Sequence, residues 1–392
     1  MRIAAMISGT SHDAIDVAVA DLAARDGELT LRPLGSLGVP FDDELRAGIV
    51  AALPPSTVGA EALCRLDTRL GQAFAAAAER AVATVGEGRV DLVVSHGQTI
   101  FHWVDGPQAL GTLQLGQPAW IAERTGLPVV ADLRSRDIAA GGHGAPLVSL
   151  FDVLLLRGSG TPAAALNLGG IANVTIVGPD PPTAFDVGPA NALLDAAVVR
   201  LTDGRDTYDE AGRRAARGTV DERLLAALLA DTYYALEPPK STGKEHFHAD
   251  YLQAALAENG EPAGDDLLAT LAELTARTVA AACRAYGVAR VVASGGGVAN
   301  ATVMGRLSAL LPGVEVGTIE RWGVDPVAKE AYAFAVLGFL TVNAVPGVVA
   351  SCTGAHRASV LGAVLPGADG RLPARSAPEG WRPERLLVRV GG

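Results

Sequence analysis

One carboxylate, Asp186, lies in a glycine-flanked stretch whose residue types and spacing could support chemistry. Residues 162–177 before it have the pattern of two strands about a turn, and residues 191–201 after it have helical apolar spacing. We therefore expect Asp186 at the end of a strand, where open α/β sheets usually bind their ligands. An aspartate that precedes a helix can also be a simple N-cap. From these residues alone, a catalytic carboxylate and an N-cap both stay open.

Two turns of glycine and small polar residues each join a pair of expected strands. The first turn, residues 8–16, lies between strand-like residues 2–7 and 17–21, and the second contains Gly169 and Gly170. Such turns can direct several backbone N–H groups into one concavity and admit a phosphate where a Cβ would otherwise stand. Either turn alone is more often an ordinary hairpin. Because the same theme occurs twice, the sequence predicts two similar halves that face one another.

Three further polar segments could contribute to a site. Residues 96–99 follow an apolar strand at 90–95, and three glycines, 295–297, follow a short strand at 290–293. A glycine turn before a helix favours a nucleotide, with a structural tight turn as the alternative. Residues 238–247 resemble part of a phosphate loop, but the Gly-x4-Gly-Lys-Ser/Thr spacing is absent. A phosphate loop is therefore excluded there, and a surface loop is the simpler interpretation.

Strands and helices of an α/β protein are expected to hold these residues in place. The other expected elements are strands at 29–39 and 127–131, helices at 42–53, 58–85, 267–286 and 325–343, a helix that starts near 117, and a helical region at 191–230 in which 200–217 is solvated or looped. Residues 141–146 contain three glycines and a proline and are the best domain-boundary candidate. Residues 365–392, rich in proline, glycine and charge, are expected to form a loosely held tail.

Length and charge limit the possible classes. With 392 residues, 49% of them hydrophobic, the chain is long enough for two domains. A net charge of −11 argues against nucleic acid or an anionic membrane as the main partner. An acidic protein can still bind ATP if backbone amides and a metal ion screen the phosphates. We therefore expect no nucleic acid and no membrane as partners, and a nucleotide stays possible.

Cysteine, histidine and hydropathy patterns indicate the compartment. The three cysteines share no motif spacing, which is typical of reduced thiols in a cytosolic protein. The seven histidines show no metal-ligand spacing, so no protein-bound zinc or other metal is predicted. The most apolar window, residues 331–350, contains Asn343 and Pro346 and predicts a buried helix rather than a membrane span. No export signal is visible in residues 1–7, and we expect a cytoplasmic protein.

Eight blocks of the chain, in order, resemble the 1,6-anhydro-N-acetylmuramic acid kinase family of the acetate and sugar kinase/heat-shock ATPase/actin superfamily. The blocks are residues 9–11 with Asp13, Ile15 and Asp16; residues 95–99 with His102; Ala131, Asp132 and Arg134 with residues 137–142 and 144–147; residues 167–173; Phe185, Asp186, Gly188, Pro189 and Asn191; residues 240–243 with Glu245 and Phe247; residues 295–297; and Glu330, Ala331, Ala333 and Phe334. Eight blocks in this order make a chance match unrealistic.

The resemblance implies a fold and a domain arrangement. The fold is α/β, with two ribonuclease-H-like (actin-like ATPase) domains around a central cleft. The first domain would span residues 1–140 and the second residues 141–345, while residues 346–392 would return to the first domain. Because the two glycine turns lie on different halves, we also expect ATP to favour a closed form, with residues 141–146 as a candidate hinge. The resemblance also implies a homodimer.

The resemblance assigns ligands to residues of this chain. The implied ATP-binding residues are Gly9, Thr10, Ser11, His12, Asp13, Ala14, Ile15, Asp16, Asn167, Gly169, Gly170, Gly295, Gly296 and Gly297. The implied sugar-binding residues are His96, Thr99 and Arg134. Asp186 corresponds to the family's catalytic base, and Glu330 would help hold the attacking water. Mg²⁺ would bridge the phosphates of ATP, held largely through water by carboxylates such as Asp13.

The implied reaction joins bridge opening to phosphoryl transfer and gives N-acetylmuramic acid 6-phosphate and ADP, a step of cell-wall (peptidoglycan) recycling. Water attacking the anomeric carbon would free O6 as the nucleophile for the γ-phosphoryl group of ATP, with Asp186 as general base. Another sugar kinase or a polyphosphate hydrolase of the same superfamily is one alternative, and a nucleotide-binding regulator without catalysis is another. The chain departs from the family's usual residues at His12, Ala14, His143, Val187, Ala190 and Ala299, and none of these departures removes a proposed catalytic group.

Overall fold

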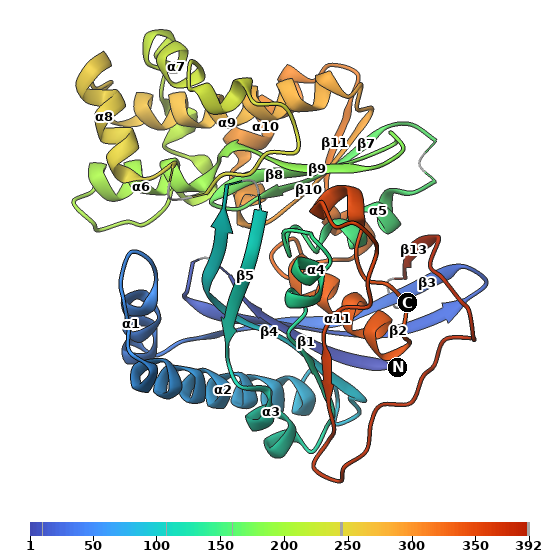
Figure 1. Cartoon of the computed structure of the whole chain (residues 1–392). Coiled ribbons are helices and arrows are strands. Elements are labelled where there is room, and N and C mark those ends of the chain that lie inside the picture. The colour runs from blue at the N-terminus through green and yellow to red at the C-terminus, as the bar shows by residue number, and fades with distance from the viewer. Residues whose placement is uncertain (10, 107, 159, 244–245, 390–392) are drawn as a thin grey trace. The chain divides into compact units, whose positions relative to one another are not determined.

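The computed structural model describes residues 1–9, 11–106, 108–158, 160–243 and 246–389 (Figure 1). The chain forms two compact units: unit 1 is Met1–Arg157 together with Trp322–Gly392, and unit 2 is Gly158–Arg321. The division expected from the sequence lies after residues 140 and 345. Unit 2 therefore begins later and ends earlier than the predicted second domain.

Unit 1 is built on a mixed sheet around strand β1. β1 (Arg2–Ser8) pairs antiparallel with β2 (Ala14–Arg25), which pairs antiparallel with β3 (Glu28–Pro40). On its other side β1 pairs parallel with β4 (Leu92–Asp105), and β4 pairs parallel with β6 (Val129–Ala131). The order β3-β2-β1-β4-β6 thus combines a three-stranded antiparallel meander with two parallel strands. This order brings the end of β1 and the middle of β4 together.

Unit 2 repeats this arrangement. β7 (Ala163–Leu168), β8 (Ile171–Val177) and β9 (Thr183–Pro189) form an antiparallel meander. β10 (Arg290–Ser294) pairs parallel with β7, and β11 (Glu315–Thr318) pairs parallel with β10. The order β9-β8-β7-β10-β11 matches that of unit 1 in sequence and direction. Both sheets have the strand arrangement of a ribonuclease-H-like domain, so the predicted α/β fold is confirmed.

One helix of unit 1 is almost wholly buried. α11 (Lys329–Val342) contacts β1, β2 and β4, and each residue from 331 to 342 is buried. A Cβ on Gly338 would lie 2.2 Å from Val94, so only glycine permits this close approach to β4. The buried helix expected in this apolar window is therefore confirmed. No helix in the described ranges combines the length and the hydropathy of a membrane span.

The remaining α-helices are divided between the two units. In unit 1 they are α1 (Asp43–Ala52), α2 (Ala60–Ala83), α3 (Pro118–Thr125), α4 (Ser135–Ala139), α5 (Ser149–Leu156) and α12 (Ala350–Thr353). In unit 2 they are α6 (Asn191–Leu201), α7 (Glu222–Leu229), α8 (Ala249–Asn259), α9 (Gly264–Ala285) and α10 (Ala301–Leu310). Each sheet has its own hydrophobic core, with Leu70 and Phe74 of α2 in one and Leu271 and Val279 of α9 in the other.

Several elements differ from the sequence-based expectation. The strand at 90–95 extends to Asp105 and pairs with an unexpected strand, β5 (Gln108–Leu115). The helices α5 and α8 are also unexpected. Their apolar or alanine-rich sequences carry too little periodic contrast to be distinguished from strands or loops.

The C-terminal segment is not the loosely held tail that its composition predicts. β12 (Ala363–Leu365) pairs with β6, and β13 (Arg385–Val388) pairs with β3. Trp381 is 7% exposed, and its ring packs edge-on against Phe339 at a centroid distance of 6.2 Å. The prediction of a loose tail is therefore wrong, because local composition does not reveal strand partners that lie far away in the sequence. The expected return of this segment to the first sheet agrees with the pairing.

The glycine-rich residues 141–146 are held inside unit 1. Asp137 of α4 is fully buried, and its carboxylate accepts hydrogen bonds from the Gly144 N–H at 2.7 Å and from the Thr353 hydroxyl at 2.9 Å. The His143 N–H donates to the carbonyl of Thr353 at 2.8 Å. These bonds tie the segment to α12. The chain then continues through α5 before it leaves unit 1, so the unit boundary lies beyond the expected position.

Candidate active site

The first glycine-containing turn links β1 to β2 in unit 1. His12 has a φ of 53°, and its N–H donates to the carbonyl of Gly9 at 3.3 Å. The hydroxyl of Ser11 donates to the carboxylate of Asp13. A Cβ at Gly9 would meet no atom within 4 Å, so the packing of the described residues does not require glycine there. Thr10 lies outside the described residues. The bare side of Gly9 is a place where a phosphate could approach.

Asp16, early in β2, lies in a negative environment. Burial, and then the charges of Asp13, Glu330 and Asp325, together raise the pKa of Asp16 to about 6. Carboxylates are the ligands that Mg²⁺ prefers, and a cation would relieve this repulsion. Among the described residues, no group of three or more histidine, cysteine or acidic side chains is arranged to hold a metal ion. The donor set therefore fits a Mg²⁺ ion bound through water and phosphate oxygens rather than in a protein cage.

Three of the predicted ATP-binding residues are fixed by strand pairing. Ala14 lies opposite Pro40 across β2 and β3, and Ile15 is 1% exposed in the core of unit 1. Asn167 lies opposite Asn173 across β7 and β8 in unit 2. Ile15 can therefore present only its backbone to a ligand.

His96 and Arg134 form a closely defined pair in unit 1. Arg134 donates from Nε to Nε2 of His96 at 2.7 Å, and Nδ1 of His96 lies 2.9 Å from the carbonyl oxygen of Gly97. Because Nε2 accepts, the neutral imidazole carries its proton on Nδ1. Burial, and then the Arg134 cation, lower the pKa of His96 to about 3. Arg134 also donates to the carbonyl of Gly144 at 2.6 Å. The pair combines a neutral imidazole with a fixed cation.

Glu330 lies in the first turn of α11 and is partly exposed. Burial raises its pKa, while the charges of Arg134 and Lys329 act against that increase. The neighbouring Lys329 is 4% exposed and pairs with Asp152 of α5, with 2.6 Å between Nζ and Oδ1. A carboxylate with a raised pKa beside a cation can hold water and exchange a proton with it.

Thr99 lies on β4, beyond His96. Its hydroxyl oxygen accepts a hydrogen bond from Gln114 Nε2 at 3.1 Å across β4 and β5. His96 and Thr99 thus lie on either side of Gln98, which pairs with Ser8 at the end of β1, and the charge of Glu330 acts on Arg134. Unit 1 thus contains a cluster of polar groups of the kind that binds a hydroxylated, anionic small molecule.

The second glycine turn, between β7 and β8, belongs to unit 2. The carbonyl of Gly169 accepts from the N–H of Asn191 at 3.0 Å, and the carbonyl of Gly170 accepts from the N–H groups of Ala190 and Ala192 at 3.0 Å. These bonds satisfy the first N–H groups of α6, and the residue before the helix, Ala190, makes no side-chain cap. Asp186 is therefore not the N-cap of this helix.

Asp186 lies within β9, beside a β-bulge, rather than at the end of the strand. It pairs with Asn173 of β8, and the register shifts between Ala172 and Asn173, which leaves Val187 as the extra residue on β9. The strand continues to Pro189. Bulges next to active sites commonly re-aim a side chain. The expected strand-end position is thus corrected to a bulge within the strand.

Four hydrogen bonds hold Asp186 to a later segment of unit 2. The Ser241 hydroxyl and the Thr242 N–H each donate to Oδ2 of Asp186 at 3.0 Å. The Asp186 N–H donates to the carbonyl of Lys240 at 3.1 Å, and the Tyr233 hydroxyl donates to the carbonyl of Asp186 at 2.7 Å. Both the backbone and the carboxylate of Asp186 are therefore positioned by this segment.

Tyr233, Ser241 and Thr242 were not among the site residues predicted from the sequence. They lie 47 to 56 positions after Asp186, too far for any local pattern to connect them. The available signal was the family resemblance of residues 240–243, which appears in the same series of blocks as Asp186. That resemblance assigned no role to Ser241 or Thr242.

The three consecutive glycines after β10 are not equivalent. A Cβ on Gly295, whose φ is 84°, would lie 2.6 Å from Asn167 Oδ1, and one on Gly297 would lie 2.7 Å from Leu168 Cβ. A Cβ on Gly296 would meet no atom within 4 Å. Gly295 and Gly297 are therefore required by packing against β7, which supports the structural alternative for these two. Of the three, only Gly296 has free space beside its backbone, so packing does not account for a glycine at this position.

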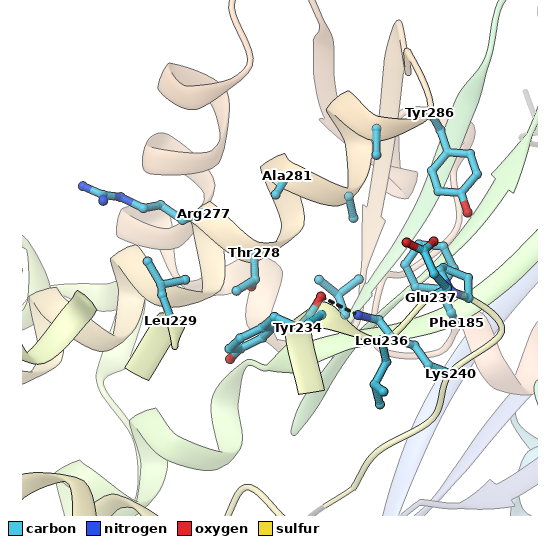
Figure 2. Close-up of a pocket in the computed structure, with 15 residues that line it drawn as sticks. Phe185, Leu229, Tyr234, Leu236, Glu237, Lys240, Arg277, Thr278, Ala281 and Tyr286 are labelled. Atoms are coloured by element: carbon cyan, nitrogen blue, oxygen red, sulfur yellow. Dashed lines mark hydrogen bonds between the residues drawn. The ribbon is translucent and has the colours of Figure 1, made fainter. Parts of the chain in front are cut away.

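A separate cavity of about 540 Å³ lies in unit 2 between β9, α9 and residues 234–240 (Figure 2). Phe185 and Val187, the neighbours of Asp186, line it, whereas Asp186 does not. Its polar lining includes Lys240 and Arg277. The cavity contains none of the predicted site residues.

The chain is similar in sequence to known proteins over its whole length. Residues 1–367 match the family described as "Anhydro-N-acetylmuramic acid kinase". The chain is 56% identical over 393 residues to the "Anhydro-N-acetylmuramic acid kinase" of Streptomyces coelicolor, with 100% of both chains covered. It is 52% identical over 398 residues to the protein of the same name from Rhodococcus erythropolis, covering 98% of this chain and all of that relative. The chain belongs to the anhydro-N-acetylmuramic acid kinase family.

Proposed function

We propose that this chain uses ATP and water to convert 1,6-anhydro-N-acetylmuramic acid into N-acetylmuramic acid 6-phosphate and ADP, a step of peptidoglycan recycling. Family membership over the whole chain supports the kinase activity. The observation that carries the mechanism is the environment of Asp186: this residue is not the N-cap of α6, and its carboxylate is held beside a bulge by two donors to Oδ2. Such an environment suits a general base.

In the proposed reaction Asp186 accepts the proton of the attacking water. The water oxygen forms a bond to the anomeric carbon as the bond from that carbon to O6 breaks. O6 then bonds to the γ-phosphorus of ATP, and the bond from that phosphorus to the bridging oxygen of ADP breaks. Water enters opposite the departing oxygen, so the anomeric configuration inverts, as in inverting glycosidases.

The polar cluster of unit 1 is proposed to bind the sugar. The Arg134 cation would pair with the carboxylate of the lactyl group, and the geometry of its guanidinium suits such an anion. His96, neutral, would serve as a hydrogen-bond partner rather than as a charge. Glu330 would hold the water that attacks, and Thr99 would bind a sugar hydroxyl.

The two glycine turns and Gly296 are proposed to bind ATP. Gly9 and Gly296 have room beside their backbone that packing does not require, as a close approach by phosphate or ribose would need. The carboxylates of Asp13 and Asp16 would hold Mg²⁺ through water. When bound, Mg²⁺ neutralises charge on the phosphates during transfer. We further propose a homodimer that works in the cytoplasm, with no nucleic-acid partner.

An ADP-release assay with and without 1,6-anhydro-N-acetylmuramic acid tests the proposal. We expect ADP release that depends on the anhydro sugar and a product that carries phosphate on O6. Turnover with glucose or N-acetylglucosamine but not with the anhydro sugar would indicate another sugar kinase. ATP binding without turnover on any sugar would indicate a regulator. Omission of Mg²⁺ in the same assay tests the metal, and the molar mass in solution by light scattering tests the dimer.

A further inference from the structure

The segment 240–242 covers the outer edge of β9 at Asp186. β9 is the last strand on its side of the unit 2 sheet, so its outer backbone groups have no neighbouring strand. The Asp186 N–H instead donates to the carbonyl of Lys240, and the next two residues turn their donors onto Oδ2 of Asp186. One short segment therefore holds both the main chain and the carboxylate of the same residue.

Lys240 fastens this segment to the turn that precedes it. Its ammonium donates to the carbonyls of Tyr233 and Tyr234 at 3.2 and 3.3 Å, and it lies 4.7 Å from the centre of the Tyr233 ring. Figure 2 shows the bond from Lys240 to Tyr234 at the edge of the cavity. Tyr233 in turn donates from its hydroxyl to the carbonyl of Asp186. Tyr233 at the start of residues 233–242 and Thr242 at the end thus both donate hydrogen bonds to Asp186. Lys240 links the two ends through its bonds to the carbonyls of Tyr233 and Tyr234.

The two donors to Oδ2 differ in kind. Thr242 uses its backbone N–H, which any residue except proline supplies. Ser241 uses its side-chain hydroxyl, and its side chain is otherwise exposed to solvent. Hydrogen bonds to an ionised carboxylate are stronger than neutral ones and favour the charged form. Removal of the Ser241 hydroxyl would therefore make the orientation of the Asp186 side chain less fixed and would destabilise its ionised form. It would not open a cavity in the core, because Ser241 is exposed.

We propose that Ser241 is a positioning residue: its hydroxyl, with the Thr242 N–H, orients the Asp186 carboxylate and keeps it ionised for proton transfer. This inference rests on the proposed function of Asp186 as a general base. Among the described residues, the titratable groups near Asp186 include Tyr233, in the turn that precedes the segment, and Lys240, whose carbonyl accepts the Asp186 N–H. Burial and the Asp186 charge raise the pKa of Tyr233, and burial lowers the pKa of Lys240.

The test compares Ser241→Ala with Ser241→Thr, which keeps a hydroxyl. Loss of one charge-assisted hydrogen bond corresponds to a decrease in kcat of roughly 10- to 100-fold in Ser241→Ala. The KM values for ATP and for the sugar should change less than about threefold, because Ser241 acts through Asp186 rather than on the ligands. The acidic limb of the kcat–pH profile should move to higher pH, and Ser241→Thr should restore most of the rate. Ser308→Ala, which removes an exposed serine hydroxyl from α10, is the matched control and should behave as wild type.

A second measurement does not depend on turnover. In protein labelled with ¹³C at the aspartate carboxyl groups, the signal absent from Asp186→Asn identifies Asp186, and its titration should move to higher pH in Ser241→Ala. Unchanged titration together with a wild-type kcat–pH profile in Ser241→Ala would overturn the positioning role. If the wild-type protein shows no ADP release that depends on the anhydro sugar, the proposed function fails, and the NMR titration still decides whether Ser241 acts on Asp186.

Discussion

Arg134 and His96 are joined by one hydrogen bond of 2.7 Å in which the guanidinium donates and the imidazole accepts. Protonation of His96 would remove the acceptor and place two positive charges next to each other. Burial of the ring is the larger cost, and together with the Arg134 charge it lowers the pKa of His96 to about 3. The imidazole is therefore neutral at every pH at which the enzyme is expected to work, and Arg134 remains the cation of the pair.

The first prediction concerns the pH dependence of stability. The pKa of His96 is lower in the folded protein than its ordinary 6.5. Below about pH 6.5 His96 therefore binds a proton in the unfolded chain but not in the folded chain. Stability should fall as the pH decreases from 6.5, by at most about 1.4 kcal/mol per pH unit. His96→Gln, which keeps an acceptor for Arg134, should lose this component. Urea unfolding at about pH 7 and about pH 5 measures it, with His356→Gln at an exposed position as the control. Equal pH dependence in wild type and His96→Gln would contradict the neutral buried imidazole.

Ionisation of Asp16 should give stability the opposite dependence on pH. Its pKa is about 6 in the folded protein and near 3.8 in the unfolded chain, so the folded form holds a proton between these values and gains stability as the pH falls from 6 to 3.8. Above pH 6 the buried charge costs stability, and Asp16→Asn should be more stable than wild type by roughly 1–2 kcal/mol after allowance for solvent screening.

This advantage of Asp16→Asn should vanish near pH 4. Thermal unfolding from about pH 4 to about pH 8 measures it. Asp21→Asn is the control, because Asp21 pairs with Arg2 at 2.8 Å and its pKa is lowered, so that this variant should be destabilised at neutral pH. The same sign for both variants would refute the assignment.

Asp186→Asn should separate chemistry from structure. Asparagine keeps an oxygen that can accept from Ser241 and Thr242 but cannot take the proton of water, so the fold and ATP affinity should be retained. The rate of ADP release that depends on the anhydro sugar should fall by at least roughly 10²–10⁴-fold. Steady-state kinetics, calorimetric ATP titration and the anomeric configuration of the first product by NMR measure these properties. Near-normal turnover of the variant, or retention of configuration in wild type, would exclude Asp186 as the base.

The neighbouring glycines Gly296 and Gly297 should respond differently to alanine. A methyl group at Gly297 would lie 2.7 Å from Leu168 Cβ and 2.9 Å from its carbonyl oxygen, so Gly297→Ala should cost about 1–3 kcal/mol of folding free energy. Gly296→Ala should leave the melting temperature unchanged and weaken ATP binding, because the free space beside Gly296 is assigned to the nucleotide. Calorimetry gives both quantities. Unchanged ATP affinity in folded Gly296→Ala would remove this residue from the site.

Trp381 should stabilise unit 1 although it lies in the segment with the least regular composition. Its indole is buried against Phe339 of α11, so Trp381→Ala should lower the free energy of unfolding by about 3–5 kcal/mol. Leu372→Ala, in the same segment at a position that is 62% exposed, is the matched control and should have little effect. Chemical denaturation compares the two variants. Equal small effects would restore the interpretation of a loose tail.

The features that depend on local pattern could be predicted from the amino-acid sequence. The repeated strand, small polar turn and strand predicted the two similar sheets, and the apolar window after Glu330 predicted the buried helix α11. Periodicity and turn chemistry suffice for these features, because each depends on neighbours within a few residues. The family resemblance added the fold and the kinase class, and it named Asp186 through a block of sequence rather than through a physical contact.

The complete fold showed which residues act on one another. It placed Ser241 and Thr242 on the carboxylate of Asp186, added β12 and β13 to the first sheet, and distinguished the packing glycine Gly297 from the bare Gly296. Each of these relationships joins segments that are distant in the chain and that meet only when the core of a whole unit offsets the entropy of closing the loop between them. A local window of sequence contains one partner of each pair and therefore cannot specify the other.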